Sequence, residues 1–261
     1  MMSPLHLEIE AKLVIESEAP REVALAIGRL STLGVWHLSE RQPVKVRDTY
    51  FDLSGDALGG LGIALRLRRS PGECLITVKG PETEAGGILE RRELEDPWSE
   101  AAIESALAYL ASHGLHLTVP DGISRYDEPE HVLNAAGLVP TQDRTTRRVR
   151  RALITQANAG GSLAEVSVDE VVFHLGSRTV GHYEVEIELE EAGDAATVGS
   201  VRAALQEQWS DLRPWPYSKY VTGRAIANLL AHLDPAELIG PGDVLKPRSY
   251  GVIEELLRRQ G

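Results

Sequence analysis

The sequence has little cysteine and no long apolar run. Cys74 is the single cysteine among 261 residues, which excludes a disulfide framework and any zinc site built on cysteines. No uninterrupted apolar stretch approaches the roughly 20 residues that a membrane-spanning helix needs. The opening residues, MMSPLHLEIEAK, have neither the basic stretch nor the apolar core of a signal peptide. We therefore expect a cytoplasmic protein without a membrane partner.

Positive charge is in the minority, and lysine is scarce. The 27 Lys and Arg residues, of which five are lysines, face 39 Asp and Glu residues, so the formal net charge is -12. A field of that sign repels nucleic acid, and we expect no nucleic-acid partner. An anionic substrate would need a local cluster of basic residues. The apolar and charged fractions, 43% and 25%, are those of an ordinary globular protein.

The hydrophobic pattern predicts strands and helices in alternation rather than one repeated unit. Helices fall between groups of strands instead of after every strand, which favours an α+β fold with an eight-stranded antiparallel β-barrel and helices packed outside. Strands are predicted at 6–15, 44–53, 62–69, 73–80, 87–95, 143–155, 163–175 and 179–190, with a turn at 158–161 between the sixth and seventh. Helices are predicted at 20–33, 98–112, 128–136, 194–209, 217–232 and 249–259.

Charged residues recur at every second position within several predicted strands. Glu8, Glu10 and Lys12 share one strand face, and apolar residues occupy the other. A single strand of this kind is usually the solvated face of a half-buried sheet. Here the signs are sorted by strand, whereas a solvated face would mix them to reduce repulsion. The acidic group comprises residues 8, 10, 184, 186 and 188, and the basic group comprises residues 66, 68, 79 and 147.

These two groups suit two kinds of ligand. Carboxylate oxygens are the ligands that Mg²⁺ and Mn²⁺ prefer. Arginine binds phosphate oxygens through its planar fork, and lysine binds them as a point charge. The pattern therefore predicts a polar-lined barrel that holds a divalent metal and a polyphosphate.

Nine short segments stand between residues 8 and 220: EIEAK at 8–12, RDTYFD, LRLR, ITVKG, RRELE, TTRR, SVDE, EVEIEL and SKY. EIEAK resembles the ExExK signature of the CYTH superfamily, the triphosphate tunnel metalloenzymes, and the other eight follow in that family's order. Over residues 8 to 220 the chain therefore resembles this family, in the group of class IV adenylyl cyclases and thiamine triphosphatases. The histidine-rich CHAD domain that follows in many bacterial members is not expected here.

The resemblance implies an open barrel that binds a triphosphate-containing small molecule with Mg²⁺ or Mn²⁺. Among the residues at matching positions, Tyr50 and Lys79 resemble a pair that assists deprotonation of water; Tyr50 could equally be a wall tyrosine. The implied metal ligands are Glu8, Glu10, Asp169, Glu184, Glu186 and Glu188. The implied phosphate ligands are Lys12, Arg66, Arg68, Lys79, Arg91, Arg147 and Lys219, with Glu8, Glu10, Lys79 and Tyr50 as catalytic residues.

The expected organisation is a CYTH domain over 1–232 and a tail with a short helix over 233–261, in a monomer or homodimer. The expected function is metal-dependent hydrolysis of inorganic triphosphate, a short polyphosphate or thiamine triphosphate, with water attacking the terminal phosphorus. Two alternatives stay open. An adenylyl cyclase would use the 3′-hydroxyl of ATP as its nucleophile, and a non-catalytic sensor would bind a polyphosphate or nucleotide without turning it over.

Overall fold

The computed structural model describes residues 5–124, 127–154 and 161–260, which form an α+β fold. Most of the turn predicted at 158–161 lies outside the described residues. The strands are β1 (His6–Ile15), β2 (Thr32–Leu33), β3 (Trp36–Asp52), β4 (Ala64–Ser70), β5 (Glu73–Lys79), β6 (Thr83–Ala85), β7 (Ile88–Pro97), β8 (Val139–Ile154), β9 (Ala164–Leu175), β10 (Arg178–Leu189) and β11 (Leu212–Pro214). The α-helices are α1 (Pro20–Gly28), α2 (Glu100–Ser112), α3 (Pro129–Ala135), α4 (Ala195–Gln208), α5 (Lys219–Leu230), α6 (Pro235–Leu238) and α7 (Pro247–Gln260).

The strand pairings form a closed series. The order runs β1, β10, β9, β8, β3, β4, β5 and β7, and β7 pairs in turn with β1. The predicted ring of eight antiparallel strands is therefore confirmed. It is uneven, because β3 has 17 residues and β4 has seven.

Two compact units divide the chain. Unit 1 comprises residues 1–8, 46–83 and 90–143, and unit 2 comprises residues 9–45, 84–89 and 144–261. Strands β1, β3 and β8 each contribute residues to both units. A domain boundary between residues 232 and 233 stays a prediction.

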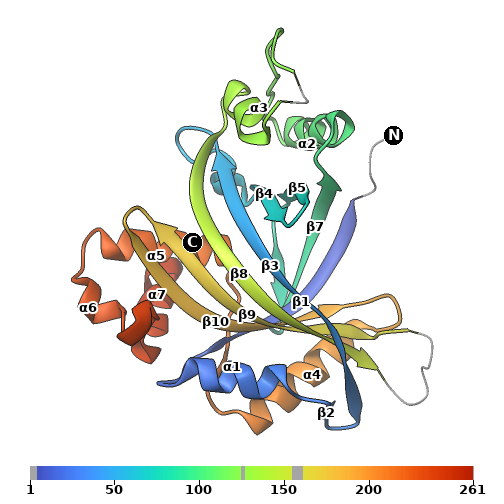
Figure 1. Cartoon of the computed structure of the whole chain (residues 1–261), viewed down its shortest axis with the longest axis vertical. Helices are drawn as coiled ribbons and strands as arrows, with labels where there is room; N and C mark the ends of the chain where they lie inside the picture. Colours follow the sequence, from blue (N-terminus) through green and yellow to red (C-terminus); the bar gives the residue numbers. More distant parts are fainter. Residues whose placement is uncertain (1–4, 125–126, 155–160, 261) are drawn as a thin grey trace. The chain divides into compact units, whose positions relative to one another are not determined.

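In unit 2, helices α1 and α4 pack on one face of the β9–β10 hairpin (Figure 1). Alternate residues of these strands, such as Val166, Val185 and Ile187, join a core that includes Ile27 of α1 and Val201 of α4. The opposite face of the same strands carries the charged residues, because successive side chains alternate across a strand.

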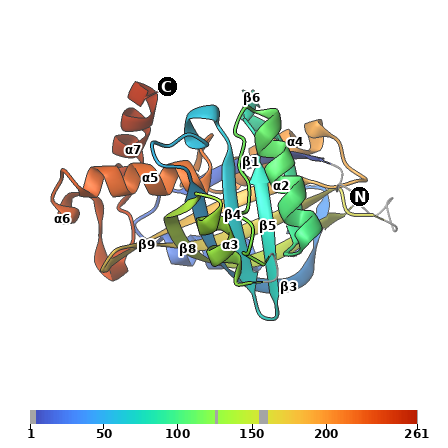
Figure 2. The same cartoon turned by 90° about the horizontal axis from the view of Figure 1, so that it is seen from above.

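In unit 1, helix α2 lies along β5 (Figure 2). The Ser99 side chain begins this helix by accepting a hydrogen bond from the backbone N–H of Ala102, an N-cap worth about 1 kcal/mol. Leu110 of α2, Leu133 of α3 and Ile76 of β5 belong to one buried cluster.

The helix predicted over 20–33 and the strand predicted over 44–53 show the largest differences from the structure. The helix predicted over 20–33 ends at Gly28, and Thr32–Leu33 form the short strand β2 against the beginning of β3. Strand β3 accordingly begins at Trp36 rather than at residue 44.

The predicted C-terminal helix is α7, and it packs on unit 2. Tyr250 and Ile253 are buried in a cluster with Phe173 of β9 and Val180 of β10. Among the described residues, no helix is long and apolar enough to span a bilayer.

Candidate functional site

Carboxylates gather on the charged face of unit 2. In the antiparallel register of β9 and β10, Asp169 lies opposite Glu184, Ser167 opposite Glu186, and Glu165 opposite Glu188. Strand β1 extends the same rows, since Glu10 pairs with Glu188 and Lys12 with Glu186. Partners in register and residues two apart share one face of a sheet, so three neighbouring strands present their acidic side chains together.

Three cations lie among these carboxylates. Lys219 Nζ is 3.0 Å from Asp169 Oδ2 and 2.6 Å from Glu186 Oε1, and it also contacts Glu184. Arg148 donates two hydrogen bonds to Asp169, of 2.8 and 2.7 Å, and one to Glu186. Lys12 Nζ is 2.9 Å from Glu10 Oε1.

Local sequence explains how Lys219 reaches the carboxylates. Ser218 caps helix α5 by accepting a hydrogen bond from the Val221 backbone N–H, and Lys219 is the first residue of that helix. Its ammonium is buried, although long charged side chains usually reach water. Burial lowers the pKa of Lys219, but Glu184, Glu186 and Asp169 outweigh it and raise the pKa above its ordinary value.

The carboxylates titrate differently. Burial and the neighbouring Glu186 and Asp169 carboxylates raise the pKa of Glu184 to about 7, although Lys219 opposes them. Burial also acts to raise the pKa of Glu186, but Lys219 and Arg148 outweigh it and hold that pKa well below its usual range. Burial lowers the pKa of His182, the next residue along this face of β10, to about 3.

Asp169, Glu184 and Glu186 fit a divalent metal ion. One ligand oxygen from each residue lies within 4.8 Å of the others, and all three residues are buried. Within the described part of the chain, Lys219 is the cation that pairs with Glu184; His182 lies 3.5 Å from Glu184, but its lowered pKa leaves the imidazole neutral at pH 7. Buried carboxylates that outnumber their cations favour an added positive charge, and an all-oxygen set suits Mg²⁺ or Mn²⁺.

One predicted phosphate ligand on the sixth predicted strand lies apart from these carboxylates. Arg147, predicted to bind phosphate, has a side chain that is 69% exposed and lies 3.4 Å from Glu170. Arg148 contacts Asp169 and Glu186 in its place. The apolar residues of β8 could have shown this from the sequence. Val149 and Leu153 lie on the same strand face as Arg147, and Leu153 belongs to the core, so Arg147 lies on the face opposite the carboxylates.

A second charged group lies in unit 1. Glu8 accepts hydrogen bonds from Lys79, at 2.8 and 2.9 Å, and from Arg91, at 2.6 Å. Burial acts to raise the pKa of Glu8, but these two cations outweigh it and lower the pKa far below its ordinary value. Glu8 thus lies with cations of unit 1, whereas the other predicted metal ligands belong to unit 2.

The remaining cations predicted in unit 1 share a face of β4. Arg68 donates to Asp48 at 2.8 Å, and Arg66 lies 3.1 Å from Glu95. Tyr50 is buried and lies opposite Arg66 in the β3–β4 register. The structure therefore brings Tyr50 to the same sheet face as the predicted phosphate ligands of β4.

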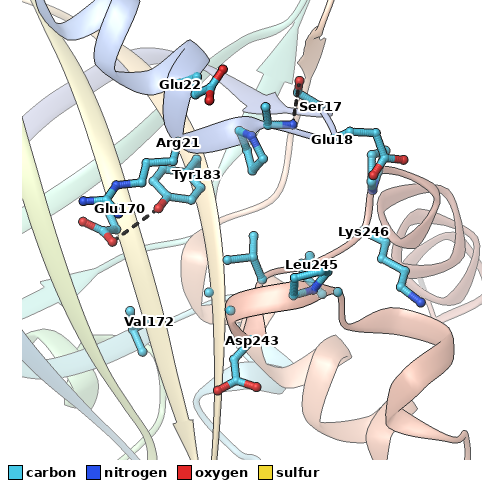
Figure 3. Close-up of a pocket in the computed structure, with 18 of the residues that line it drawn as sticks. Ser17, Glu18, Arg21, Glu22, Glu170, Val172, Tyr183, Asp243, Leu245 and Lys246 are labelled. Carbon is cyan, nitrogen blue, oxygen red and sulfur yellow. Dashed lines mark hydrogen bonds between the residues drawn. The ribbon is translucent and has the colours of Figure 1, made fainter.

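A pocket of about 960 Å³ lies on the other face of β9 and β10 (Figure 3). Its wall includes Glu170 and Tyr183, whose hydroxyl donates to the Glu170 carboxylate at 3.3 Å. These two residues immediately follow Asp169 and precede Glu184, so they point away from the carboxylate cluster. The pocket is therefore separate from the candidate metal centre.

Comparisons with solved structures give similarities at low identity. HpAC1 from Hippeastrum, an adenylyl cyclase candidate described as having a dominant triphosphatase activity, is 17% identical with a TM-score of 0.49, over 88% of this chain and 99% of that chain. The PH1819 protein of Pyrococcus horikoshii is 16% identical with a TM-score of 0.48, over 86% and 99%. The S. pombe RNA triphosphatase Pct1 is 14% identical with a TM-score of 0.37, over 82% and 86%.

No match was found among curated proteins. The model of the CYTH domain matches residues 6–210, which is more than half of the chain. The chain therefore belongs to the CYTH family.

Proposed function

We propose that this protein is a divalent-metal-dependent hydrolase of a triphosphate-containing substrate. Inorganic triphosphate or a short polyphosphate is the preferred candidate, with thiamine triphosphate next. The observation that carries the proposal is the buried group in unit 2, where three carboxylates fit a metal ion and two cations, Arg148 and Lys219, contact the same carboxylates.

Asp169, Glu184 and Glu186 would hold Mg²⁺ or Mn²⁺, and Glu10 and Glu188 are neighbouring predicted ligands. When bound, such an ion supplies charge neutralisation at the phosphoryl oxygens and a water of lowered pKa. Phosphoryl transfer needs in-line positioning and electrostatic stabilisation more than covalent chemistry. The carboxylates would therefore fix the position of the metal ion, and the charge of the ion would orient the terminal phosphate.

Lys12, Arg148 and Lys219 would bind the phosphate oxygens. Each now contacts a carboxylate, and each has further N–H donors to offer a phosphate because ammonium carries three and guanidinium five. Lys219 and Arg148 enter from α5 and β8, so two separate elements determine where an anion can lie. Lys79, Arg66, Arg68 and Arg91 of unit 1 remain proposed phosphate ligands, and Glu8 and Tyr50 remain proposed catalytic residues.

The carboxylates favour hydrolysis over simple anion binding. A sensor for polyphosphate would bind more tightly without buried negative charge, since like charges repel. No base-recognition pocket is needed for inorganic triphosphate, and water as the nucleophile requires no second substrate.

The test is phosphate release from inorganic triphosphate, long-chain polyphosphate, thiamine triphosphate and ATP, each with Mg²⁺ and with Mn²⁺. We expect metal-dependent release that Glu10→Gln greatly reduces. Cyclic AMP formation from ATP would instead identify a cyclase, and tight triphosphate binding without release of phosphate would identify a sensor.

A further inference from the structure

The charged face of unit 2 is closed at one end. Beyond Asp169 and Glu184, the next residue of β10 on this face is His182, which is fully buried. Its ring stacks on Phe173 at 5.5 Å between centroids, and Tyr250 of α7 lies 6.3 Å away. Because Val180 and Ile253 continue this apolar packing, a ligand in the cluster cannot extend in that direction within unit 2.

The other end of the same face is open to solvent and holds two arginines. Towards this end, the charged face of β9 runs from Asp169 through Ser167 to Glu165, against the chain direction. The charged face of the neighbouring β8 runs from Arg148 to Arg150. The Arg150 and Arg41 side chains are 33% and 27% exposed, against 18% for Arg148. Exposure therefore increases from the metal-binding carboxylates towards Arg41 and Arg150.

Both arginines are held by carboxylates in two-pronged contacts. Arg150 donates from Nε to the oxygens of Glu165, at 3.0 and 2.9 Å, and its Nη2 lies 2.7 Å from Glu165 Oε2. Arg41 donates to Glu165 at 2.6 Å and, from its second terminal nitrogen, to Glu190 at 2.7 Å. Two cations thus face Glu165 and Glu190 at this end, where Glu188 also lies opposite Glu165 in the strand register.

We propose that Arg41 and Arg150 bind the phosphates of a linear polyphosphate that lie beyond the group at Lys12, Arg148 and Lys219. This inference rests on the proposed function and assigns the substrate class: inorganic polyphosphate chains longer than triphosphate. Residues two apart on a strand are about 6.6 Å apart, so Arg150 lies one step beyond Arg148 on the open side. A chain whose first phosphates occupy the closed end extends past Arg150.

Arginine suits a phosphate contact of this kind. Its fork binds phosphate with the same two-pronged geometry that it uses for carboxylate. The Arg41 and Arg150 side chains are 27% and 33% exposed, whereas Glu165 is only 8% exposed. Because a guanidinium carries five N–H donors, a phosphate would bind the donors that the carboxylates do not use, while the buried Glu165 keeps its partners.

The experiment measures the dissociation constants of triphosphate and of long-chain polyphosphate by calorimetry, with Mg²⁺, for the wild type and Arg150→Ala. We expect Arg150→Ala to weaken the binding of long-chain polyphosphate roughly tenfold relative to the binding of triphosphate, because one charge-assisted contact is lost. Arg41→Ala should act in the same direction. Arg213→Ala is the matched control, because Arg213 is also half-buried in unit 2 and paired with two carboxylates, Glu16 and Glu254.

Removing Arg150 alone also takes one cation away from Glu165. The carboxylate would then repel phosphate, and binding would weaken even if Arg150 had never contacted the phosphate. The double variant Arg150→Gln with Glu165→Gln removes both charges. A ratio that still disfavours the long chain supports direct contact, and a ratio that returns to the wild-type value overturns the proposal. An unchanged ratio in Arg150→Ala, or no preference of the wild type for the longer chain, also overturns it.

Phosphate release from triphosphate by the wild type is measured alongside. Absence of release with an intact effect on the binding ratio would remove the proposed hydrolase function and keep the polyphosphate subsite. Phosphate release by the wild type together with an unchanged binding ratio in Arg150→Ala would keep the hydrolase function and remove the polyphosphate subsite.

Discussion

Arg147 and Arg148 are adjacent in the chain and lie on opposite faces of β8. Arg148 contacts two carboxylates of the candidate metal centre, whereas Arg147 is largely exposed and faces Glu170. We predict that Arg148→Ala lowers kcat/KM for triphosphate about 100-fold, because a fixed donor to a highly charged transition state is lost. Arg147→Ala should stay within about twofold of the wild type. Equal effects of the two substitutions would contradict this assignment, with thermal unfolding as the check that both variants fold.

Glu95 provides a test by pH. Burial acts to raise its pKa, but Arg66, Arg68 and the Thr77 hydroxyl outweigh it and lower the pKa. A carboxyl with a lowered folded-state pKa stabilises the protein above its unfolded pKa, and that stabilisation is lost as pH falls through the folded value. Glu95→Gln should therefore cost about 1 kcal/mol at pH 7 and less as pH falls below about 4.

The comparison is made by urea unfolding at several pH values, with the exposed Glu90→Gln as the control. A cost for Glu95→Gln that is constant between pH 7 and pH 3 would show that its charge does not stabilise the fold.

Helix α7 provides a stability prediction at the scale of the secondary-structure element. Ile253 is fully buried against β9 and β10, whereas its neighbour Val252 is 38% exposed. Ile253→Ala should lower the free energy of unfolding by about 2–5 kcal/mol, the usual cost of such a cavity. Val252→Ala should cost no more than about 0.5 kcal/mol. If both substitutions cost the same, α7 does not form part of the core of unit 2.

Strand periodicity explains why most elements could be predicted and some residues could not. Alternation in EVEIEL and EIEAK shows which side chains share a face, and the β1–β10 register agrees, with Glu10 opposite Glu188. The four arginines within 147–151 lie on both faces of their strand, so they do not show which of them face the carboxylates unless Val149 and Leu153 are also considered. Arg41 could not be found, because its partners Glu165 and Glu190 are more than 120 residues away in sequence.

At the scale of the whole molecule, the net charge of -12 is a sum over all residues and does not give the local charge at the site. Burial removes the carboxylates and their cations from bulk water, and nearby charges then interact much more strongly than at the surface. The family match and the closed series of eight strands are consistent with the resemblance found in the sequence. We propose that residues outside the shared motifs, such as Arg41, decide the choice of substrate.

The most direct test of the metal-dependent hydrolase is phosphate release from inorganic triphosphate by the wild type and by Glu186→Gln. Each is measured with Mg²⁺, with Mn²⁺ and with a chelator. We predict release that requires the metal and falls at least about 100-fold in Glu186→Gln, since that carboxylate contacts both Arg148 and Lys219 and is a candidate ligand. Release that persists in the chelator, or a folded Glu186→Gln variant with wild-type activity, would contradict the account.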